Sequence, residues 1–261
     1  MRFIFFILLI FFTGYTARAQ KITLLPQVGV QFIKSKLEYA TLASINNRYL
    51  HLNPYVGFRL MYQTKKGCGP FAGIANGNIG YSYELFLPAT IDMNVYDLHR
   101  SSSMVDVWRF ELGYHWNTKP IYFKKIWDNH VSREDFANLK QKGLSVRIQP
   151  LIGLAYQKIN EIGPGGATSG LNGAYITEED IPTGKSGNFA IVAGLGFEFG
   201  RNDKRKFTLS FNYVRGIGLS AYRTKLTIDT PSANYKGLLG SNGTGFNITL
   251  GIPLTLWSKK R

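Results

Sequence analysis

The most constraining feature of this sequence is a strict alternation of side chains near its C-terminal end. Over the twelve residues from Gly245 to Leu256, the even positions are apolar and the odd positions are small or polar, and Trp257 follows. Successive side chains of a β-strand point to opposite faces, so this segment predicts a strand with one wholly apolar face. Most strands of soluble proteins are shorter, whereas a tilted strand needs roughly 9–11 residues to cross a bilayer. The segment therefore predicts a membrane-spanning strand.

The N-terminus has the pattern of a secretory signal peptide. Arg2 is followed by ten apolar residues, and Ala17-Arg18-Ala19 forms a small-residue cleavage site before Gln20. An uncleaved membrane anchor is the alternative, but ten apolar residues are about half of what a spanning helix needs. We therefore predict that residues 1–19 are removed and that residues 20–261 form one exported domain.

Seven further segments share this alternation, so the sequence predicts an all-β fold, an eight-stranded antiparallel transmembrane β-barrel. Bacterial outer-membrane barrels have an even number of antiparallel strands with apolar residues outside and polar residues inside. The seventh segment loses its phase at Val214-Arg215-Gly216, where we expect a β-bulge. The expected strands are about 21–34, 50–62, 70–86, 104–116, 144–158, 187–200, 206–221 and 243–257.

The connections between these segments alternate in length, which indicates the orientation of the barrel. Outer-membrane barrels have short periplasmic turns and longer outer loops. Residues 63–69 and 201–206 are short connections, whereas the long ones are rich in Gly, Ser, Asn and Thr: 35–48, 87–103, 161–186 and 222–241. The long segment 119–143 falls on the periplasmic side. Its capping box at Ser132-Arg133-Glu134-Asp135 is compatible with a short helix over 133–141.

Aromatic residues cluster near the ends of the expected strands. Aromatic girdles at both membrane interfaces are typical of membrane barrels, and core aromatics of a soluble protein would not sort to strand ends. The girdle expected at the periplasmic rim contains Tyr62, Phe71, Trp116, Phe199, Phe207 and Trp257. The girdle expected at the outer rim contains Tyr83, Trp108, Tyr156, Phe189 and Tyr222.

The polar face of the strands is expected to line the lumen. Charges in so narrow a space need partners. We therefore expect a stabilising network of Arg59, Arg109, Glu111, Arg147 and Glu198. Barrels of about eight strands are just wide enough for side chains to fill, so a plugged interior is favoured over a general diffusion pore. A proton or ion path is the alternative.

Positive charge gathers on the side expected to face the periplasm. The periplasmic segments hold fifteen Lys or Arg and four acidic residues, whereas the outer loops hold seven and eight. This asymmetry predicts a basic rim that includes Lys124, Lys125, Lys204, Arg205 and Lys206. Outer-membrane lipid or an acidic periplasmic or secretion-machinery protein fits such a rim, and nucleic acid is not an expected partner of an exported protein. Solvated charge without a partner is the simpler alternative.

No pattern in the sequence demands an active site, a cofactor or a metal. His51 and His99 fall near the expected outer rim with Asp92, Asp97 and Ser101 to Ser103, the residue types of barrel enzymes that act on lipid or peptide. Their spacing does not require them to meet, and no cluster of metal ligands stands out. We therefore expect no enzymatic activity and no cofactor.

Three segments resemble the small outer-membrane β-barrel family that includes the PorT-like proteins and, more distantly, the OmpA-type membrane domain. They are Ala17-Arg18-Ala19-Gln20, Phe211-Asn212-Tyr213-Val214-Arg215-Gly216 and Phe246 to Trp257. The resemblance implies an integral protein of the outer membrane of a Gram-negative bacterium, associated with protein secretion. The expected function is therefore a non-enzymatic, structural or accessory role in an envelope or secretion assembly. A narrow channel for ions or small solutes is the alternative, and a barrel enzyme is a third.

Overall fold

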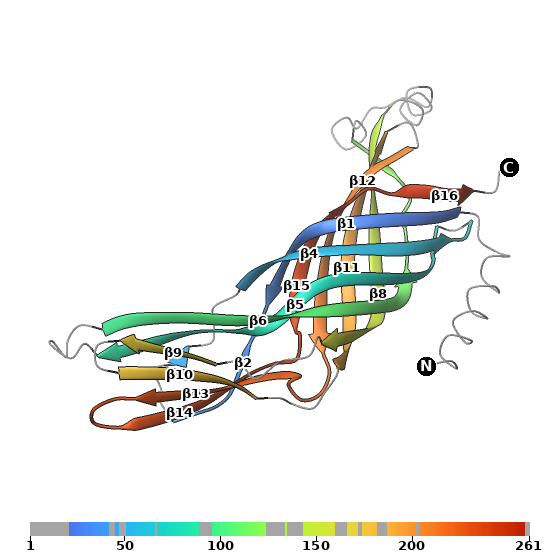
Figure 1. Cartoon of the computed structure of the whole chain (residues 1–261). Coiled ribbons are helices and arrows are strands. Elements are labelled where there is room, and N and C mark those ends of the chain that lie inside the picture. Colours follow the sequence, from blue (N-terminus) through green and yellow to red (C-terminus); the bar gives the residue numbers. More distant parts are fainter. Residues whose placement is uncertain are drawn as a thin grey trace, which may run out of the picture.

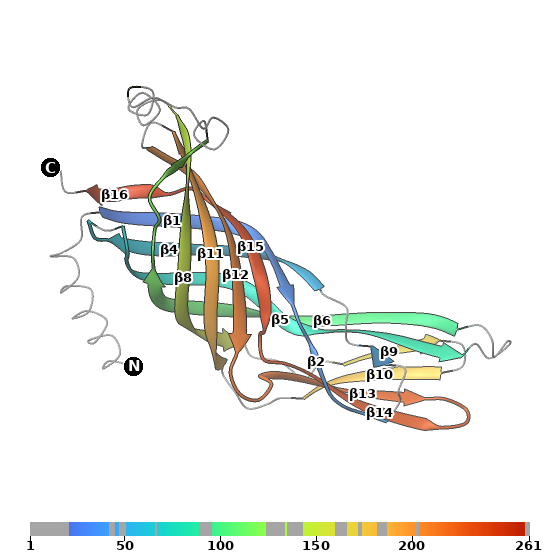
Figure 2. The ribbon, with the colours of Figure 1, turned by 180° about the vertical axis from the view of Figure 1, so that it is seen from behind.

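Eight antiparallel strands close into a barrel in the computed structural model of the protein (Figure 1 and Figure 2). Each strand pairs with the next one along the chain, and the last pairs with the first to complete the ring. The predicted all-β, eight-stranded antiparallel fold is confirmed. The barrel strands are β1 (Lys21–Ile33), β4 (His51–Gln63), β5 (Gly69–Pro88), β6 (Tyr96–His115), β8 (Leu144–Ile159), β11 (Gly187–Arg201), β12 (Lys204–Gly216) and β15 (Gly245–Gly251).

The structure describes residues 21–41, 45–46, 51–65, 67–88, 96–123, 134, 143–159, 166–171, 174–181, 187–201 and 204–258. The predicted signal peptide, residues 1–19, lies outside these ranges. So does the predicted helix 133–141, apart from Glu134, whose backbone is helical. Within the described ranges, no helix is long and apolar enough to cross a membrane. The short strand β7 (Ile121–Tyr122) extends the wall by pairing with the start of β8.

A second antiparallel sheet of five strands lies beside the far ends of β5 and β6 (Figure 1 and Figure 2). Its order is β2 (Lys36–Ala40), β14 (Asn234–Ser241), β13 (Tyr222–Asp229), β10 (Ala174–Ile181) and β9 (Gly166–Leu171). The sequence predicts these segments as irregular loops, which is wrong. It also starts the fourth strand at 104, whereas β6 begins at Tyr96 and pairs with β5 as far as Pro88. The two-residue strand β3 (Ile45–Asn46) adds to the edge of β5. We call this end of the barrel the sheet end, and the opposite end, with the β4–β5 turn, the turn end.

Tyrosines fasten the second sheet to the β5–β6 hairpin. Tyr81 and Tyr83 of β5 donate hydrogen bonds to Glu178 of β10, at 2.5 and 2.7 Å. The ring of Tyr222 stacks on that of Tyr81 with 5.9 Å between centroids, and its hydroxyl donates to Asp180 at 2.8 Å. Buried apolar side chains complete this core: Ile79, Leu85, Val107, Ile159, Ile176, Leu226, Ile228 and Leu239. The second sheet therefore packs against the hairpin, and the two together form a hydrophobic core that is separate from the barrel interior.

This packing corrects part of the predicted aromatic girdles. Tyr62, Phe71, Tyr83 and Tyr222 are all buried, with at most 7% of their surface exposed. Phe71 faces the barrel interior, and Tyr83 and Tyr222 face the second core. Alternation shows which residues share a face, but it does not tell whether that face meets the outside, the lumen or another sheet.

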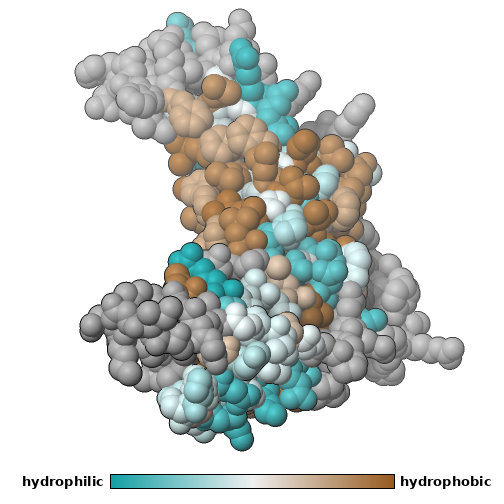
Figure 3. Space-filling model, turned by 60° about the vertical axis from the view of Figure 1, so that its left-hand side comes forward, coloured by the Kyte–Doolittle hydropathy of each residue, from teal (hydrophilic) through white to brown (hydrophobic). Residues whose placement is uncertain are grey.

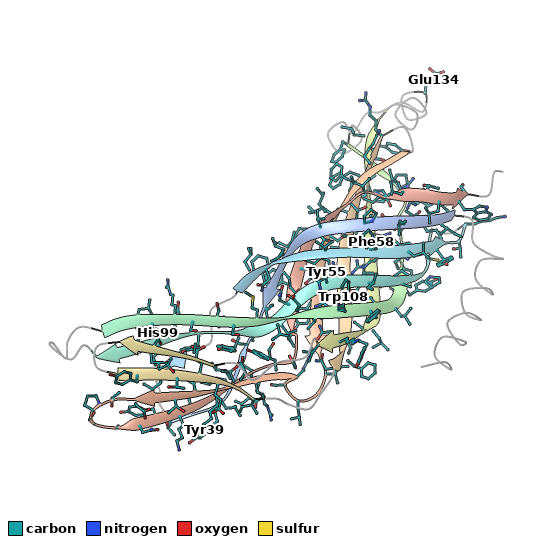
Figure 4. The ribbon with its side chains drawn as sticks, viewed as in Figure 1. Tyr39, Tyr55, Phe58, His99, Trp108 and Glu134 are labelled. Carbon is teal, nitrogen blue, oxygen red and sulfur yellow. The ribbon has the colours of Figure 1, made fainter. Side chains whose placement is uncertain are left out.

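The outside of the barrel carries an apolar belt. In β15, Phe246 and Leu250 are 37% and 48% exposed, whereas Asn247 and Thr249 are buried, so the predicted phase of this strand is confirmed. Figure 3 shows the belt as a brown band between more hydrophilic ends. Phe58 and Trp108, labelled in Figure 4, are 50% and 42% exposed members of it.

The bulge predicted at Val214-Arg215-Gly216 lies instead at the start of β12. From Phe207 onward, β12 pairs with β11 in unbroken register, but Gly200 pairs with Arg205, which leaves Lys206 as the extra residue. An extra residue changes the phase of a strand. Arg205 therefore faces the interior while Phe207 remains 40% exposed outside. The strand itself ends at Gly216, five residues before the predicted end at 221.

The predicted eighth strand, 243–257, is divided in two. β15 ends at Gly251, and after Ile252-Pro253 the chain continues as β16 (Leu254–Ser258). Proline has no N–H to give to a ladder and often marks such an interruption. β16 pairs with the first residues of β1, from Lys21 to Leu24.

Replacing Glu178 with Gln should loosen the second sheet, because two buried tyrosine hydroxyls lose a charged acceptor. We expect a loss of about 1.5–3 kcal/mol in the free energy of releasing the sheet, measured by limited proteolysis at increasing urea. Glu179→Gln is the matched control, since this 64% exposed side chain only pairs with Lys225 at 3.4 Å. Its effect should stay below about 0.5 kcal/mol. Equal effects of the two changes would contradict the assignment of Glu178.

The same tyrosines should make the second sheet sensitive to alkali. Burial and the hydrogen bonds to Glu178 raise the pKa of Tyr81 and Tyr83, and burial raises the pKa of Tyr222 to about 12. A tyrosine with a raised pKa in the folded state contributes stability below about pH 10 that is lost as the pH rises through the folded pKa. We expect these tyrosines to ionise, as absorbance at 295 nm reports, only when protease protection of the sheet is lost. If these tyrosines ionise near pH 10, the ordinary tyrosine pKa, while the sheet is still protected from protease, this expectation is refuted.

Candidate functional site in the barrel interior

Inward-facing side chains of the barrel strands fill the lumen. β1 contributes Thr23, Gln27 and Gln31, and β15 contributes Asn247 and Thr249, none of them more than 2% exposed. Apolar side chains share the interior with them: Leu25, Met61, Phe71, Leu151, Val192 and Val214. The barrel interior is thus occupied by side chains, as expected for a barrel of this strand number.

Arg59 of β4 and Glu111 of β6 form a buried ion pair across the intervening strand. The Nε and Nη2 atoms of Arg59 each lie 2.9 Å from Oε2 of Glu111, and both side chains are at most 3% exposed. Gly73 of β5 stands in register between them and has no side chain to separate them. A Cβ at Gly73 would lie 3.1 Å from Cγ of Arg59 and 3.4 Å from Oε2 of Glu111. The guanidinium also lies over the ring of Phe71, 5.4 Å from its centroid.

Glu198 of β11 binds two arginines at the turn end of the lumen. Its Oε1 lies 3.3 Å from Nη1 of Arg147 and 2.9 Å from Nε of Arg205. Arg147 is the direct cross-strand neighbour of Glu198, so register alone brings these two together. Arg205 in addition donates from Nη2 to Oε1 of Gln63 on β4, at 2.6 Å. This cluster therefore ties β8, β11 and β12 to the opposite wall.

Arg109 of β6 lacks a carboxylate partner among the described residues. Its side chain is 1% exposed, and its Cζ lies 5.9 Å from the centroid of the Tyr55 ring. A cation over an aromatic face is attracted by the ring quadrupole, which partly offsets the cost of burying this charge. The five predicted lumen residues thus fall into two ion-paired groups and one separate arginine. Their functional role remains a prediction.

Only two of the five side chains of the predicted basic rim, those of Arg205 and Lys206, lie in the described structure. Lys124 and Lys125 lie outside the described residues. Lys204 begins β12, although its side chain is not described, and Lys206 is exposed. Arg205 is a lumen residue that pairs with Glu198, so its assignment to a solvent-facing rim is wrong. The bulge at Lys206 is the reason, because it turns Arg205 inward.

The turn between β14 and β15 lies against the sheet end of the lumen. Gln157 donates from Nε2 to the carbonyl oxygen of Gly243 at 3.4 Å, and Asn188 donates from Nδ2 to that of Asn242 at 2.6 Å. Gly243 has a φ of 75°, and a Cβ there would lie 2.1 Å from Oε1 of Gln157. Only glycine fits this position, so the turn is built to close onto the lumen side chains.

The residues considered for catalysis are only partly described. His99 lies along the β5–β6 hairpin (Figure 4), with its ring 6.0 Å from that of Tyr83. Ser103 shares a 2.9 Å hydrogen bond with the hydroxyl of Tyr222. Asp92 and the side chains of His51 and Asp97 lie outside the described part of the chain. In that part, no group of three or more His, Cys, Asp or Glu side chains is placed to hold a metal ion.

The chain was compared with protein-family models, curated proteins and solved structures. No protein-family model matches the chain, and no curated protein matches its sequence. The chain is similar to a solved structure, that of the outer membrane protein OprG from Pseudomonas aeruginosa. The match covers 91% of this chain and 97% of the OprG chain. The two share 11% sequence identity, and the TM-score is 0.40.

Neutralising one member of the buried Arg59–Glu111 pair should destabilise the barrel. Glu111→Gln leaves a buried guanidinium without its counter-charge, which costs about 3–5 kcal/mol in unfolding free energy. The double variant Arg59→Met with Glu111→Gln removes both charges and should recover most of this loss. Urea unfolding of the folded protein measures both. If the double variant loses as much stability as the single variants Glu111→Gln and Arg59→Met lose together, the pairing is contradicted.

Proposed function

We propose that this chain is an integral outer-membrane β-barrel protein with a non-enzymatic, structural or accessory role in an envelope assembly. The belt of exposed apolar side chains carries this proposal. Trp108, Phe110 and Leu112 on the outward face of β6, and Trp116 directly after this strand, are each 42–45% exposed. A soluble monomer rarely exposes apolar patches beyond a few hundred Å². The belt is therefore best explained by contact with lipid.

The dimensions of the belt fit a bilayer. Along β6 and the residue that follows it, the belt runs from Trp108 to Trp116, close to the roughly 9–11 residues that a tilted spanning strand needs, with an aromatic residue at each end. Beyond Trp108, the outward side of the hairpin carries the exposed hydrogen bond between Asn78 and Asp106 and the ion pair between Glu84 and Arg100. The second sheet then lies in water outside the cell, and the turn end faces the periplasm.

We further propose a role in protein secretion like that of the PorT-like proteins. It rests on the resemblance of the signal sequence and of the last two barrel segments to that family. A periplasmic or secretion-machinery protein is the partner class that we propose. With the turn end in the periplasm, that end of the barrel is the side on which such a partner would bind, and the barrel would serve as its membrane anchor.

A narrow channel is the second candidate function. Several buried lumen atoms have no hydrogen-bond partner within the described structure, among them both side-chain polar atoms of Asn247 and Oγ1 of Thr249. Buried polar groups are commonly satisfied by ordered water, which a thin water path along β15 would supply. Conductance of the purified protein in planar bilayers separates the two candidates. Steady conductance through single molecules favours the channel, and its absence with correctly inserted protein favours the anchor.

Arginine in place of Leu250 tests the membrane placement. Leu250 lies in the belt, so Leu250→Arg should cost about 2–4 kcal/mol in unfolding free energy from phosphatidylcholine vesicles. Tyr175→Arg on the second sheet is the control, because this 63% exposed residue lies outside the belt and should change stability by less than about 0.5 kcal/mol. In water the two substitutions would be equally harmless. Similar small effects at both sites would therefore refute insertion of the barrel.

A further inference from the structure

The barrel wall has a seam at its turn end, between β12 and β16. β12 pairs with β15 only as far as the Thr208–Gly251 pair. Below that point β12 pairs with β11, whereas β16 pairs with β1, so no ladder joins β12 to β16 among the described strands. Figure 1 and Figure 2 both show the two strands diverging. The break at Ile252-Pro253 is the local cause.

β16 forms one apolar border of this seam. All five of its residues are exposed, including Leu254 at 47%, Leu256 at 59% and Trp257 at 44%. Because both faces of β16 are exposed, neither face is covered by the rest of the described barrel. Phe207 borders the seam on β12, where its ring stacks on that of Phe199 with 4.6 Å between centroids.

The lumen side of the seam carries excess positive charge. Arg147 and Arg205 share the single carboxylate of Glu198, with both ion pairs at 3.3 Å or less. Lys21, the first residue of β1, is the cross-strand partner of Gln63, which accepts the hydrogen bond from Arg205. Three cations around one anion give this cluster a net positive charge. The arginine pair is not sealed from solvent, since the Arg147 side chain remains 23% exposed.

We propose that this seam binds an anionic phospholipid of the inner leaflet. Its head group would lie by Lys21, Arg147 and Arg205, and its acyl chains along Leu254 and Leu256. The inference rests on the membrane placement proposed above. Backbone polar groups at an unpaired strand edge cannot face hydrocarbon without partners, and a phosphate accepts hydrogen bonds from N–H groups. Excess cations at the periplasmic interface select an anionic head group over a zwitterionic one.

The test compares two spin-labelled lipids around the full-length protein in phosphatidylcholine vesicles. Electron paramagnetic resonance gives the relative association of spin-labelled phosphatidylglycerol and phosphatidylcholine with the protein. We expect phosphatidylglycerol to be preferred. Each unit of positive charge lost from the cluster should reduce the preference about fivefold.

Two variants lower the charge of the cluster by one unit through different routes. The triple change Arg147→Gln, Arg205→Gln and Glu198→Gln removes the ion pairs together, so that no carboxylate is left unpaired. Thr255→Glu adds one negative charge on exposed β16, where the side chain of Thr255 makes no hydrogen bond within the described structure. Lys225→Gln, on the second sheet, makes the same change in net charge far from the seam and should leave the preference unchanged.

Insertion is scored separately by heat-modifiable migration of each variant. If both charge variants insert and lose the preference while Lys225→Gln keeps it, the site is supported. If they insert and keep the preference, the lipid site is overturned and the membrane placement stands. Loss in the triple variant alone would overturn the seam as the site. Failure of the unmodified protein to insert would overturn the membrane placement, and this inference with it.

Discussion

Pairing of the last barrel strand with the first is the interaction on which the rest of the structure depends. β15 and β1 pair over seven residues, from Gln27–Gly251 to Ile33–Gly245. Glycine at positions 29, 245 and 251 allows this close approach, since a Cβ at Gly29 would lie 2.0 Å from the carbonyl oxygen of Ile248. Closure removes the free edges of the sheet and gives every strand an inside and an outside. The apolar belt and the polar lumen both follow from this division.

The two faces have opposite energetic requirements. Outside, apolar residues such as Leu154, at 62% exposure, are stabilised by contact with an apolar medium. Inside, charges are tolerated where strand register provides a partner, as Gly73 does by leaving room for Arg59 to reach Glu111. At the turn end the pairing of charges and of strands is incomplete, because two arginines share Glu198 and no ladder joins β12 to β16 among the described strands. That end is consequently where we place a lipid partner.

Alternation along the strands was sufficient to predict the barrel, its strand number and the orientation of β15. It was not sufficient for the second sheet, because β9 and β14 are short and rich in glycine and polar residues. Tyr81 and Tyr83 repeat with the same period as lipid-facing residues, although they pack against Glu178. The inward turn of Arg205 depends on a bulge at Lys206, and no local pattern marks it. A stronger signal was available in β13, where Tyr222, Leu226 and Ile228 alternate with polar residues.

The central claim is that alternate residues of β15 face lipid and a packed lumen. Nitroxide labels placed singly from Gly245 to Gly251, with Cys68→Ser as background, test it in phosphatidylcholine vesicles. We expect oxygen to reach labels at Phe246, Ile248 and Leu250 readily, whereas labels at Asn247 and Thr249 should be shielded from oxygen and from a water-soluble nickel complex. Access of the nickel complex to the labels at the even positions, or the absence of any two-residue period, would contradict the account.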